Sequence, residues 1–246
     1  MKKFANKTVL VTGGSRGIGA AITQRLGLEG ANVAFTYHRS GEKAQAIAAA
    51  INKAGGKALA IQADSGVPDN VTDAVNQTVK AFGGIDILIS NAGIYIGKTF
   101  EDHTLEEYEE IMSVNVRAVY VAALAAVKHM GDGGRIITIG SNMADNAVSP
   151  QTTLYTMSKS ALQGFTRGLA RDLGSKKITV NLVQPGPVDT DMNPADSELA
   201  THMRSRMALA DYGTGDDIAG LVSFLAGDEG KYITGSSLTI DGGFNA

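Results

Sequence analysis

Cysteine is absent from the 246 residues, and histidine is scarce. Without cysteine the chain has no disulfide bond, no thiolate nucleophile and no cysteine-based zinc or iron–sulfur site. The 4 histidines are scattered and include no His-x-x-x-His pair; they are His38, His103, His129 and His202. We therefore expect no metal centre.

The chain also lacks a strong charge and a long apolar run. Its 22 Lys and Arg residues against 25 Asp and Glu give a formal net charge of −3. No run of basic residues offsets this balance, which argues against a nucleic-acid partner. The longest apolar run, residues 118–127, is far too short to span a membrane, and no apolar segment precedes the first glycines. These absences predict a cytoplasmic protein without a membrane partner.

Short runs rich in β-branched residues alternate with longer helical patterns along the chain. The runs with the length of strands are 8–12, 32–37, 57–62, 85–90, 134–140, 178–183 and 237–240. Most lack apolar–polar alternation, as expected for strands buried on both faces. The helical patterns 18–30, 68–83 and 161–174 each end at a glycine, the usual residue after a helix. The sequence predicts one α/β domain, residues 1–246, with a single doubly wound parallel β-sheet of the Rossmann type and helices on both faces.

The first predicted strand runs directly into a glycine-rich stretch, TGGSRGIG, at residues 12–19. Gly13, Gly17 and Gly19 would let the backbone turn tightly and approach a pyrophosphate at the start of the next helix. A tight strand-to-helix turn favours glycine even where no ligand binds. The glycines alone therefore fit either a plain turn or a dinucleotide site. Their place in the first β–α unit favours a dinucleotide site.

Polar and small residues also follow three later strands. Residues 91–93 (Asn-Ala-Gly) follow the fourth strand, Ser141 follows the fifth, and residues 184–190 follow the sixth. Ligands of such sheets bind at the carboxyl ends of the strands. An ordinary turn explains each feature singly, but together they predict a ligand site at one edge of the sheet.

Tyr155 and Lys159 lie one helical turn apart in the stretch YTMSK. One interpretation is a surface helix whose lysine stem covers an aromatic ring. The other is a phenol whose pKa is lowered by the neighbouring ammonium, which would make it a proton donor and acceptor. Asn115 is also ambiguous, because asparagine is a poor helix former and the alternative is an ordinary exposed position.

Taken together, these motifs resemble those of the short-chain dehydrogenase/reductase family. The resemblance covers nearly the whole chain, in the order TGGSRGIG, Asp64, NAG, Asn115, Ser141, YTMSK, QPGPVDT and YITGSSLTIDGGF. The ending is similar to bacterial 3-oxoacyl-carrier-protein reductases and carbonyl reductases, and residues 158–174 and 183–195 look closer still to cyclic-di-GMP-binding biofilm-dispersal members. Two positions depart from the family pattern: Gly215 stands where proline is usual, and Ser65 where an apolar residue is common.

The resemblance implies a catalytic tetrad of Asn115, Ser141, Tyr155 and Lys159. Tyr155 would supply the proton to a carbonyl oxygen, and Lys159 would lower the pKa of the tyrosine and bond the nicotinamide ribose. Ser141 would hydrogen-bond the substrate oxygen. Asn115 would hold a water that links Lys159 to solvent.

The implied cofactor is a nicotinamide dinucleotide, and the end of the second strand favours NADP(H). No acid follows that strand until Glu42, whereas Arg16 and Arg39 flank the expected pocket and suit a 2′-phosphate. Either arginine could instead be a solvated surface charge. The expected cofactor contacts are Gly13, Ser15, Arg16, Gly17, Ile18, Gly19, Arg39, Asp64, Asn91, Ala92, Gly93, Tyr155, Lys159, Pro185, Gly186, Val188 and Thr190.

The predicted function is NADPH-dependent reduction of a ketone, an aldehyde or a 3-oxoacyl thioester to the alcohol. Residues from about 187 to 210 would cover this small-molecule substrate, and these residues and the segment 142–153 would decide which substrate is bound. The alternative function is binding of a nucleotide second messenger, cyclic-di-GMP, on the same fold. We also expect a homotetramer, with contacts from residues 118–127 and 238–244, although both segments could simply pack on the sheet.

Overall fold

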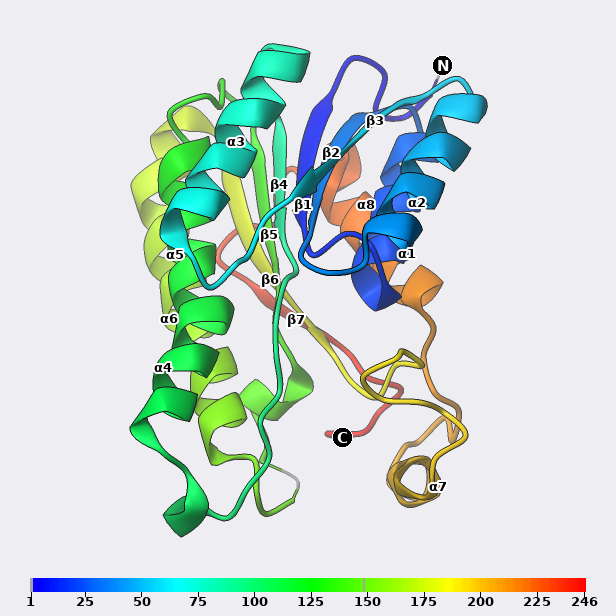
Figure 1. Ribbon diagram of the computed structural model, residues 1–246, viewed down its shortest axis with the longest axis vertical. Helices are drawn as coiled ribbons and strands as arrows, with labels where there is room; N and C mark the ends of the chain where they lie inside the picture. Colours follow the sequence, from blue (N-terminus) through cyan, green and yellow to red (C-terminus); the bar gives the residue numbers. More distant parts are fainter. Residues whose placement is uncertain (1, 148) are drawn as a thin grey trace.

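The computed structural model describes residues 2–147 and 149–246. A parallel sheet runs through the molecule in the order β3-β2-β1-β4-β5-β6-β7 (Figure 1). The strands are β1 (Thr8–Thr12), β2 (Asn32–Tyr37), β3 (Lys57–Gln62), β4 (Ile87–Ser90), β5 (Arg135–Ile139), β6 (Thr179–Pro185) and β7 (Ser237–Ile240). Every predicted strand is present, although β4 begins at Ile87 rather than at residue 85 and β6 continues to Pro185.

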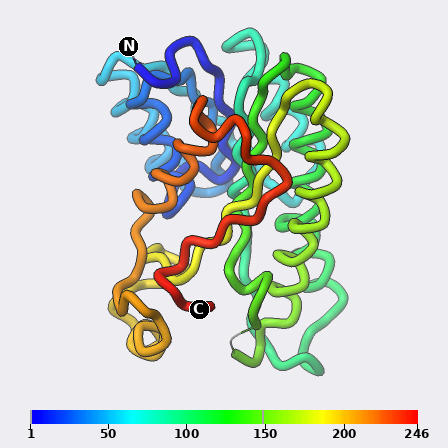
Figure 2. Tube along the Cα trace, turned by 180° about the vertical axis from the view of Figure 1, so that it is seen from behind, coloured from blue at the N-terminus to red at the C-terminus, as the bar shows by residue number. Residues whose placement is uncertain are grey.

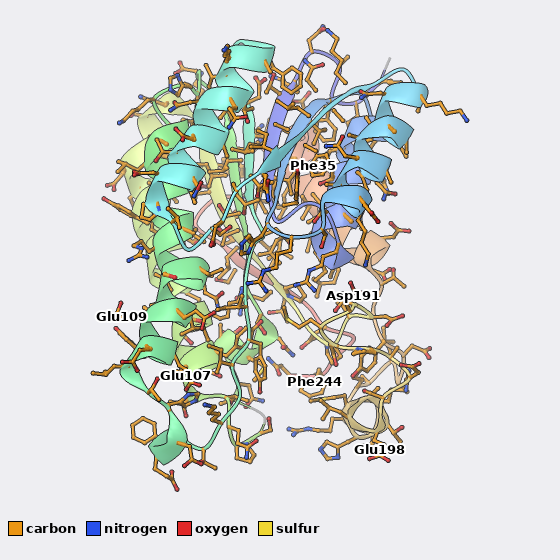
Figure 3. All side chains as sticks on the ribbon, viewed as in Figure 1. Phe35, Glu107, Glu109, Asp191, Glu198 and Phe244 are labelled. Atoms are coloured by element: carbon orange, nitrogen blue, oxygen red, sulfur yellow. The ribbon has the colours of Figure 1, made fainter. Side chains whose placement is uncertain are left out.

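Successive residues of the central strands face opposite sides of the sheet, and both sides are buried. In β1, Val9 and Val11 belong to one apolar cluster, together with Phe35 of β2 (Figure 3), whereas Leu10 belongs to the other. Ile137 and Ile136 of β5 divide between the same two clusters. This two-sided burial explains why the strands appear in the sequence as nearly continuous apolar runs.

Helices cover both faces of the sheet (Figure 1). One face carries α1 (Gly17–Leu28), α2 (Gly41–Lys53) and α8 (Gly215–Ala226); the other carries α3 (Pro68–Phe82), α5 (Ala118–Ala126) and α6 (Thr153–Leu173). Helix α4 (Leu105–Met112) continues through a π-helical turn, η2 (Ser113–Arg117), into α5, and α7 (Glu198–Arg204) follows β6. The short 3-10 turns are η1 (Phe100–Asp102), η3 (Asn142–Ala144), η4 (Gly174–Lys176) and η5 (Asp228–Gly230).

Two of the three predicted glycine helix ends have the expected left-handed backbone. Gly30, just beyond α1, has φ +104°, and Gly83, beyond α3, has φ +88°. Gly174 directly follows α6, as predicted, but its φ is −60° and its backbone is therefore not left-handed. The chain there continues for one more turn as η4, and the left-handed position falls on Lys177, with φ +55°.

The strand order reverses at the centre of the sheet, and this reversal positions the candidate site. From β1 the chain builds outward through β2 and β3, and then returns to place β4 on the other side of β1. Such a reversal leaves a crevice at the carboxyl ends of the strands. Figure 2 shows the C-terminal segment running on from β7 toward these strand ends, where Asn245 Nδ2 donates to the backbone oxygen of Asn142 at 2.8 Å.

Candidate functional site

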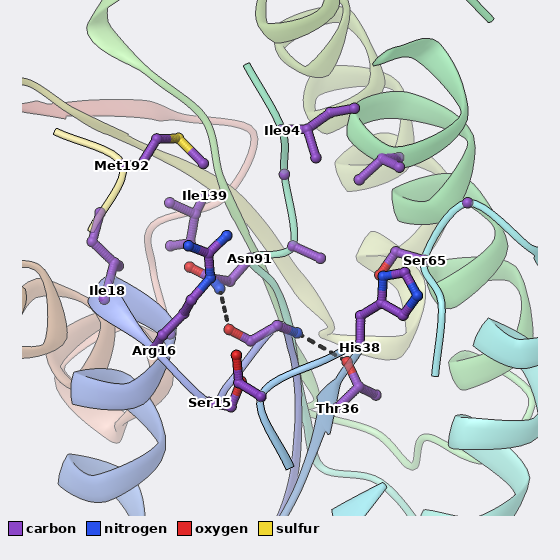
Figure 4. Close-up of a pocket in the computed structure, with 18 of the residues that line it drawn as sticks. Ser15, Arg16, Ile18, Thr36, His38, Ser65, Asn91, Ile94, Ile139 and Met192 are labelled. Carbon is purple, nitrogen blue, oxygen red and sulfur yellow. Dashed lines mark hydrogen bonds between the residues drawn. The ribbon is translucent and has the colours of Figure 1, made fainter. Parts of the chain in front are cut away.

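A cleft of about 720 Å³ lies at the carboxyl ends of the central strands. Figure 4 shows it between the β1–α1 turn and the segments that follow β2, β4 and β6. Most of the residues expected to contact a cofactor line it: Gly13, Ser15, Arg16, Gly17, Ile18, Gly19, Arg39, Asp64, Asn91, Ala92, Gly93, Tyr155, Lys159 and Thr190. The cleft therefore gathers residues from position 13 to position 190 in one place.

The β1–α1 turn is held in shape from two neighbouring strands. Gly13, with φ +65°, donates its N–H to Thr36 Oγ1 at 2.9 Å, and Asn91 Nδ2 donates to the backbone oxygen of Gly13 at 3.0 Å (Figure 4). A Cβ at Gly19 would lie 2.1 Å from that same oxygen, so no side chain fits there. The turn thus presents backbone N–H groups at the start of α1, whose first turn carries no acid.

Basic side chains line the cleft beside this turn. Arg16 comes from the β1–α1 turn, and His38 and Arg39 follow β2. Within residues 2–147 and 149–246, neither arginine forms an ion pair, whereas His38 Nε2 lies 3.7 Å from Asp64 Oδ2. Two guanidinium groups without an ion-pair partner in this part of the chain therefore line the cleft.

Lys159 is buried at the floor of the cleft, next to Tyr155. Its Nζ donates to the backbone oxygen of Ile139 at 3.0 Å and lies 5.7 Å from the centre of the Tyr155 ring. Burial away from water lowers the pKa of Lys159 to about 8 and raises the pKa of Tyr155 to about 12. This side-by-side placement is the one that the YTMSK spacing predicts.

The expected depression of the Tyr155 pKa by Lys159 is not found, and this part of the prediction is corrected. Loss of water around the phenol outweighs every neighbouring group, and a hydrogen bond with the Ser141 hydroxyl is what lowers the pKa of Tyr155. The ammonium of Lys159 donates one of its three N–H bonds to the Ile139 carbonyl. In the protein without cofactor, the group that stabilises a Tyr155 phenolate is therefore the Ser141 hydroxyl.

Asn115 lies in the π-helical turn and is 1% exposed, which excludes the ordinary surface position. Its Oδ1 accepts from the N–H of Ile94 at 2.8 Å, and its Nδ2 donates to the backbone oxygen of Ile94 and to Ser158 Oγ, each at 3.0 Å. A Cβ at Gly93 would lie 3.4 Å from both Asn115 Oδ1 and Lys159 Nζ. Glycine at position 93 therefore leaves a small gap between these two polar atoms.

Several expected residues are close to the cleft but do not line it. Ser141 is 7% exposed, and its Oγ accepts from the N–H of Met143 at 3.2 Å. Pro185 ends β6, Gly186 packs so closely on Asp241 that a Cβ would lie 2.4 Å from its Cβ, and Val188 is buried. These last three residues shape the backbone beneath the cleft.

The sequence patterns missed two residues of this site. Thr36 accepts the hydrogen bond from Gly13, and Tyr95 packs edge-on against Tyr155, with 5.1 Å between ring centres. Thr36 could have been found from the sequence, because it is a polar residue near the end of the strand that pairs with β1. Tyr95 lies in an irregular loop, and only the folded chain brings it to Tyr155.

The described residues contain no group of three or more His, Cys, Asp or Glu side chains that could hold a metal ion. No helix among them is both long and apolar enough to cross a membrane.

Comparison with known proteins assigns the family. A family model described as enoyl-(acyl carrier protein) reductase matches residues 13–245. A structure of a short-chain dehydrogenase/reductase from Serratia marcescens BCRC 10948 is 52% identical, with a TM-score of 0.98 over 99% of this chain and 100% of its own. The chain belongs to the short-chain dehydrogenase/reductase family.

Two further relatives bear on what members of this family bind. A short-chain dehydrogenase from Burkholderia cenocepacia J2315, solved in complex with NADP, is 54% identical, with a TM-score of 0.98 over 99% of this chain and 100% of its own. The cyclic-di-GMP-binding biofilm dispersal mediator protein of Escherichia coli K12 is 43% identical over the full length of both chains. The resemblance inferred from the sequence motifs is confirmed for both the family and this relative.

Proposed function

We propose that this short-chain dehydrogenase/reductase uses NADP(H) to reduce a ketone, an aldehyde or a 3-oxoacyl thioester to the alcohol. The observation that carries the proposal is the placement of Tyr155 beside a buried lysine, at the floor of a cleft that also contains the glycine turn. Proton transfer and dinucleotide binding are the two requirements of such a reduction, and this arrangement brings them together.

The residues of the cleft fit NADP(H). The glycine turn leaves backbone N–H groups free for a pyrophosphate, and a Cβ at Gly19 would close the turn. Arg16 and Arg39 would hold a 2′-phosphate, which guanidinium groups bind well. Asp64 would meet the adenine end, and Thr190 the carboxamide. The NADP complex of the Burkholderia relative supports this assignment.

The bound cofactor would supply the hydride, and Tyr155 the proton. Because burial keeps the pKa of Tyr155 near 12, its hydroxyl is protonated at neutral pH and able to donate to the substrate oxygen. Ser141 would stabilise that oxygen as negative charge develops on it. Lys159 would bond the nicotinamide ribose, and a water in the gap at Gly93 would join it to Asn115.

The substrate end of the cleft has an apolar wall. Ile94 and Met192 line it (Figure 4), and the ring of Tyr95 stands against Tyr155. The hydroxyl of Tyr95 donates to the backbone oxygen of Gln151 at 3.4 Å, and Val148 of the segment 142–153 lies outside the described residues. Such a wall suits a carbonyl compound with an apolar substituent.

The test is a panel of ketones, aldehydes and 3-oxoacyl thioesters with NADPH, read as loss of absorbance of the reduced nicotinamide. We expect Tyr155→Phe to lower kcat by about a hundredfold or more, because the transferable proton is gone while the ring remains. NADPH binding should change little. Tyr232→Phe, at a side chain that is 98% exposed, is the matched control. Near-full activity in Tyr155→Phe would remove Tyr155 from the mechanism.

A second candidate function is binding of cyclic-di-GMP, which is favoured by the 43% identity to the Escherichia coli dispersal protein. A phosphodiester would need a cradle of backbone N–H groups like the one at the β1–α1 turn. We therefore expect any cyclic-di-GMP binding to compete with NADPH. A titration in which both bind without mutual effect would require a site elsewhere.

A further inference from the structure

Gln184 is a buried amide beneath the turn that carries Ser141. It lies in β6, is 0% exposed and does not line the cleft. Its Nε2 donates to the backbone oxygen of Ser141 at 3.1 Å and to Asp145 Oδ2 at 2.7 Å. Both partners are acceptors, so the amide orientation is fixed: the flipped amide would set its oxygen against two other oxygens.

Asp145, which accepts from Gln184, is also bound to α6, the helix that carries Tyr155 and Lys159. Its Oδ1 accepts from Gln163 Nε2 of α6 at 2.5 Å. A second bond from α6, Ser160 Oγ to the backbone oxygen of Ala144, holds the same turn at 2.9 Å. The turn between residues 141 and 145 is therefore bound to β6 on one side and to α6 on the other.

Burial of this amide is costly, which argues that its hydrogen bonds are needed. Within the described part of the chain, Gln184 Oε1 is buried and has no hydrogen-bond partner. A leucine would fill similar space without a buried amide of its own, but it would take the donor away from the Ser141 backbone oxygen and from Asp145 Oδ2. An amide at this position is understandable if the Ser141 turn has to be held in one place.

We propose that Gln184 is a positioning residue, which fixes the 141–145 turn so that the Ser141 hydroxyl stays directed at Tyr155. The proposal rests on the reductase function above, because Ser141 is the group through which Gln184 acts. We call the two hydrogen bonds that Gln184 Nε2 donates to the Ser141 backbone oxygen and to Asp145 the clamp. Without the clamp, the turn moves and the hydrogen bond between Ser141 and Tyr155 weakens. The phenolate of Tyr155 then forms less readily.

The experiment compares Gln184→Leu with Asn181→Leu. Asn181 is a buried amide of the same strand, but its Nδ2 donates to the backbone oxygen of Ile233 at 2.7 Å and not to the Ser141 turn. In Gln184→Leu we expect kcat to fall by about tenfold with little change in the KM for NADPH, and the rising limb of the pH profile of alcohol oxidation to move to higher pH. In Asn181→Leu we expect loss of stability alone.

Amide hydrogen exchange tests the clamp without turnover. The N–H groups of Met143 and Ala144 bond Ser141 Oγ and the Ser141 backbone oxygen. They should exchange at least about tenfold faster in Gln184→Leu than in the wild type, and at the wild-type rate in Asn181→Leu. An inactive wild-type protein would refute the proposed function, while the exchange rates would still decide the clamp.

If Gln184→Leu does not fold, Asp145→Ala removes the outer half of the same clamp at an exposed position, and we expect shifts in the same direction. Unchanged exchange, or faster exchange with wild-type kcat and pH profile, would overturn the proposal.

Discussion

At the scale of single residues, the main result is that burial dominates the chemistry of Tyr155 and Lys159. The sequence places the two side chains one turn apart, and the fold then removes both from water. Each group is pushed toward its neutral form, because the charged form loses most on desolvation. The cost of holding a buried lysine at the cleft floor is a measurable property of the folded protein.

We predict that this cost makes stability rise with pH. The folded pKa of Lys159 is about 8, against 10.5 as the ordinary value, so between these values the unfolded chain binds a proton that the folded chain does not. The Lys159 contribution to the free energy of unfolding should therefore increase by about 2 kcal/mol from pH 8 to pH 10 and be nearly constant below that window. Urea denaturation of wild type and Lys159→Met at several pH values measures the difference.

The pH dependence has the opposite sign for Tyr155. Because its pKa is raised from 10.0 to about 12, its contribution to the free energy of unfolding is fully present below pH 10 and is lost as the pH rises from 10 toward 12. The comparison should therefore stop at pH 10. Parallel curves for wild type and Lys159→Met would show that the lysine is not desolvated.

At the scale of elements, the parallel pairing of β1 with β2 brings two separate turns together. Thr8 to Val11 are in register with Asn32 to Phe35, so the segments that follow both strands leave the sheet at the same edge. Arg16 and Arg39 therefore both line the cleft, although they come from different turns. We expect cofactor choice to depend on this pair of turns.

We predict that NADPH is preferred over NADH by at least about tenfold in kcat/KM, or about 1.4 kcal/mol. Arg39→Asp should erode or reverse the preference, because a carboxylate repels the 2′-phosphate and accepts from a free 2′-hydroxyl. The measurement is steady-state kinetics with both cofactors. Arg167→Asp, at an exposed position of α6, is the control. Equal use of both cofactors by the wild type would contradict the prediction.

The strands and the glycine turn could be predicted from the sequence because their causes are local. A strand buried on both faces is a continuous apolar run, and a turn against a helix start needs glycine. The interaction of Ser141 with Tyr155, the packing of Tyr95 and the clamp at Gln184 join elements far apart in the chain. The direction of the Tyr155 pKa shift was missed for the same reason, since burial is a property of the whole fold.

The ambiguity at Asn115 shows the same limit within one helix. A helical pattern continues through residues 105–126, and nothing in it marks the π-helical turn at Ser113–Arg117. Such turns are frequent at functional sites. The extra residue in the turn is consistent with the inward placement of Asn115, which sequence alone left open.

At the scale of the molecule, one face keeps apolar side chains in solvent. On α5, Tyr120 is 54% exposed and Leu124 is 49% exposed, while Ala122 and Ala126 of the same helix are buried against the sheet. A groove of about 360 Å³ lies beside Tyr120, between α4 and α6. The apolar run of residues 118–127 thus has one face in the core and one free for a second copy of the chain.

We predict a homotetramer, with this face in a subunit contact. Light scattering at micromolar concentration should give four times the 25.5 kDa of one chain. Leu124→Asp should lower that mass, because a carboxylate would have to be desolvated in the contact. Leu28→Asp, on the exposed face of α1, is the control. A wild-type mass near 25.5 kDa would refute the prediction.

The reversal of strand order at β1 also affects how the protein refolds. β1 pairs with both β2 and β4, and the cleft exists only when β5 and β6 have joined the same edge. Helices form from near neighbours in microseconds, whereas parallel strands must first close long loops and are slow to pair. A refolding chain therefore gains most of its helix before it has any cleft. During that interval the unpaired strand edges are open to other chains, and aggregation competes with recovery of activity.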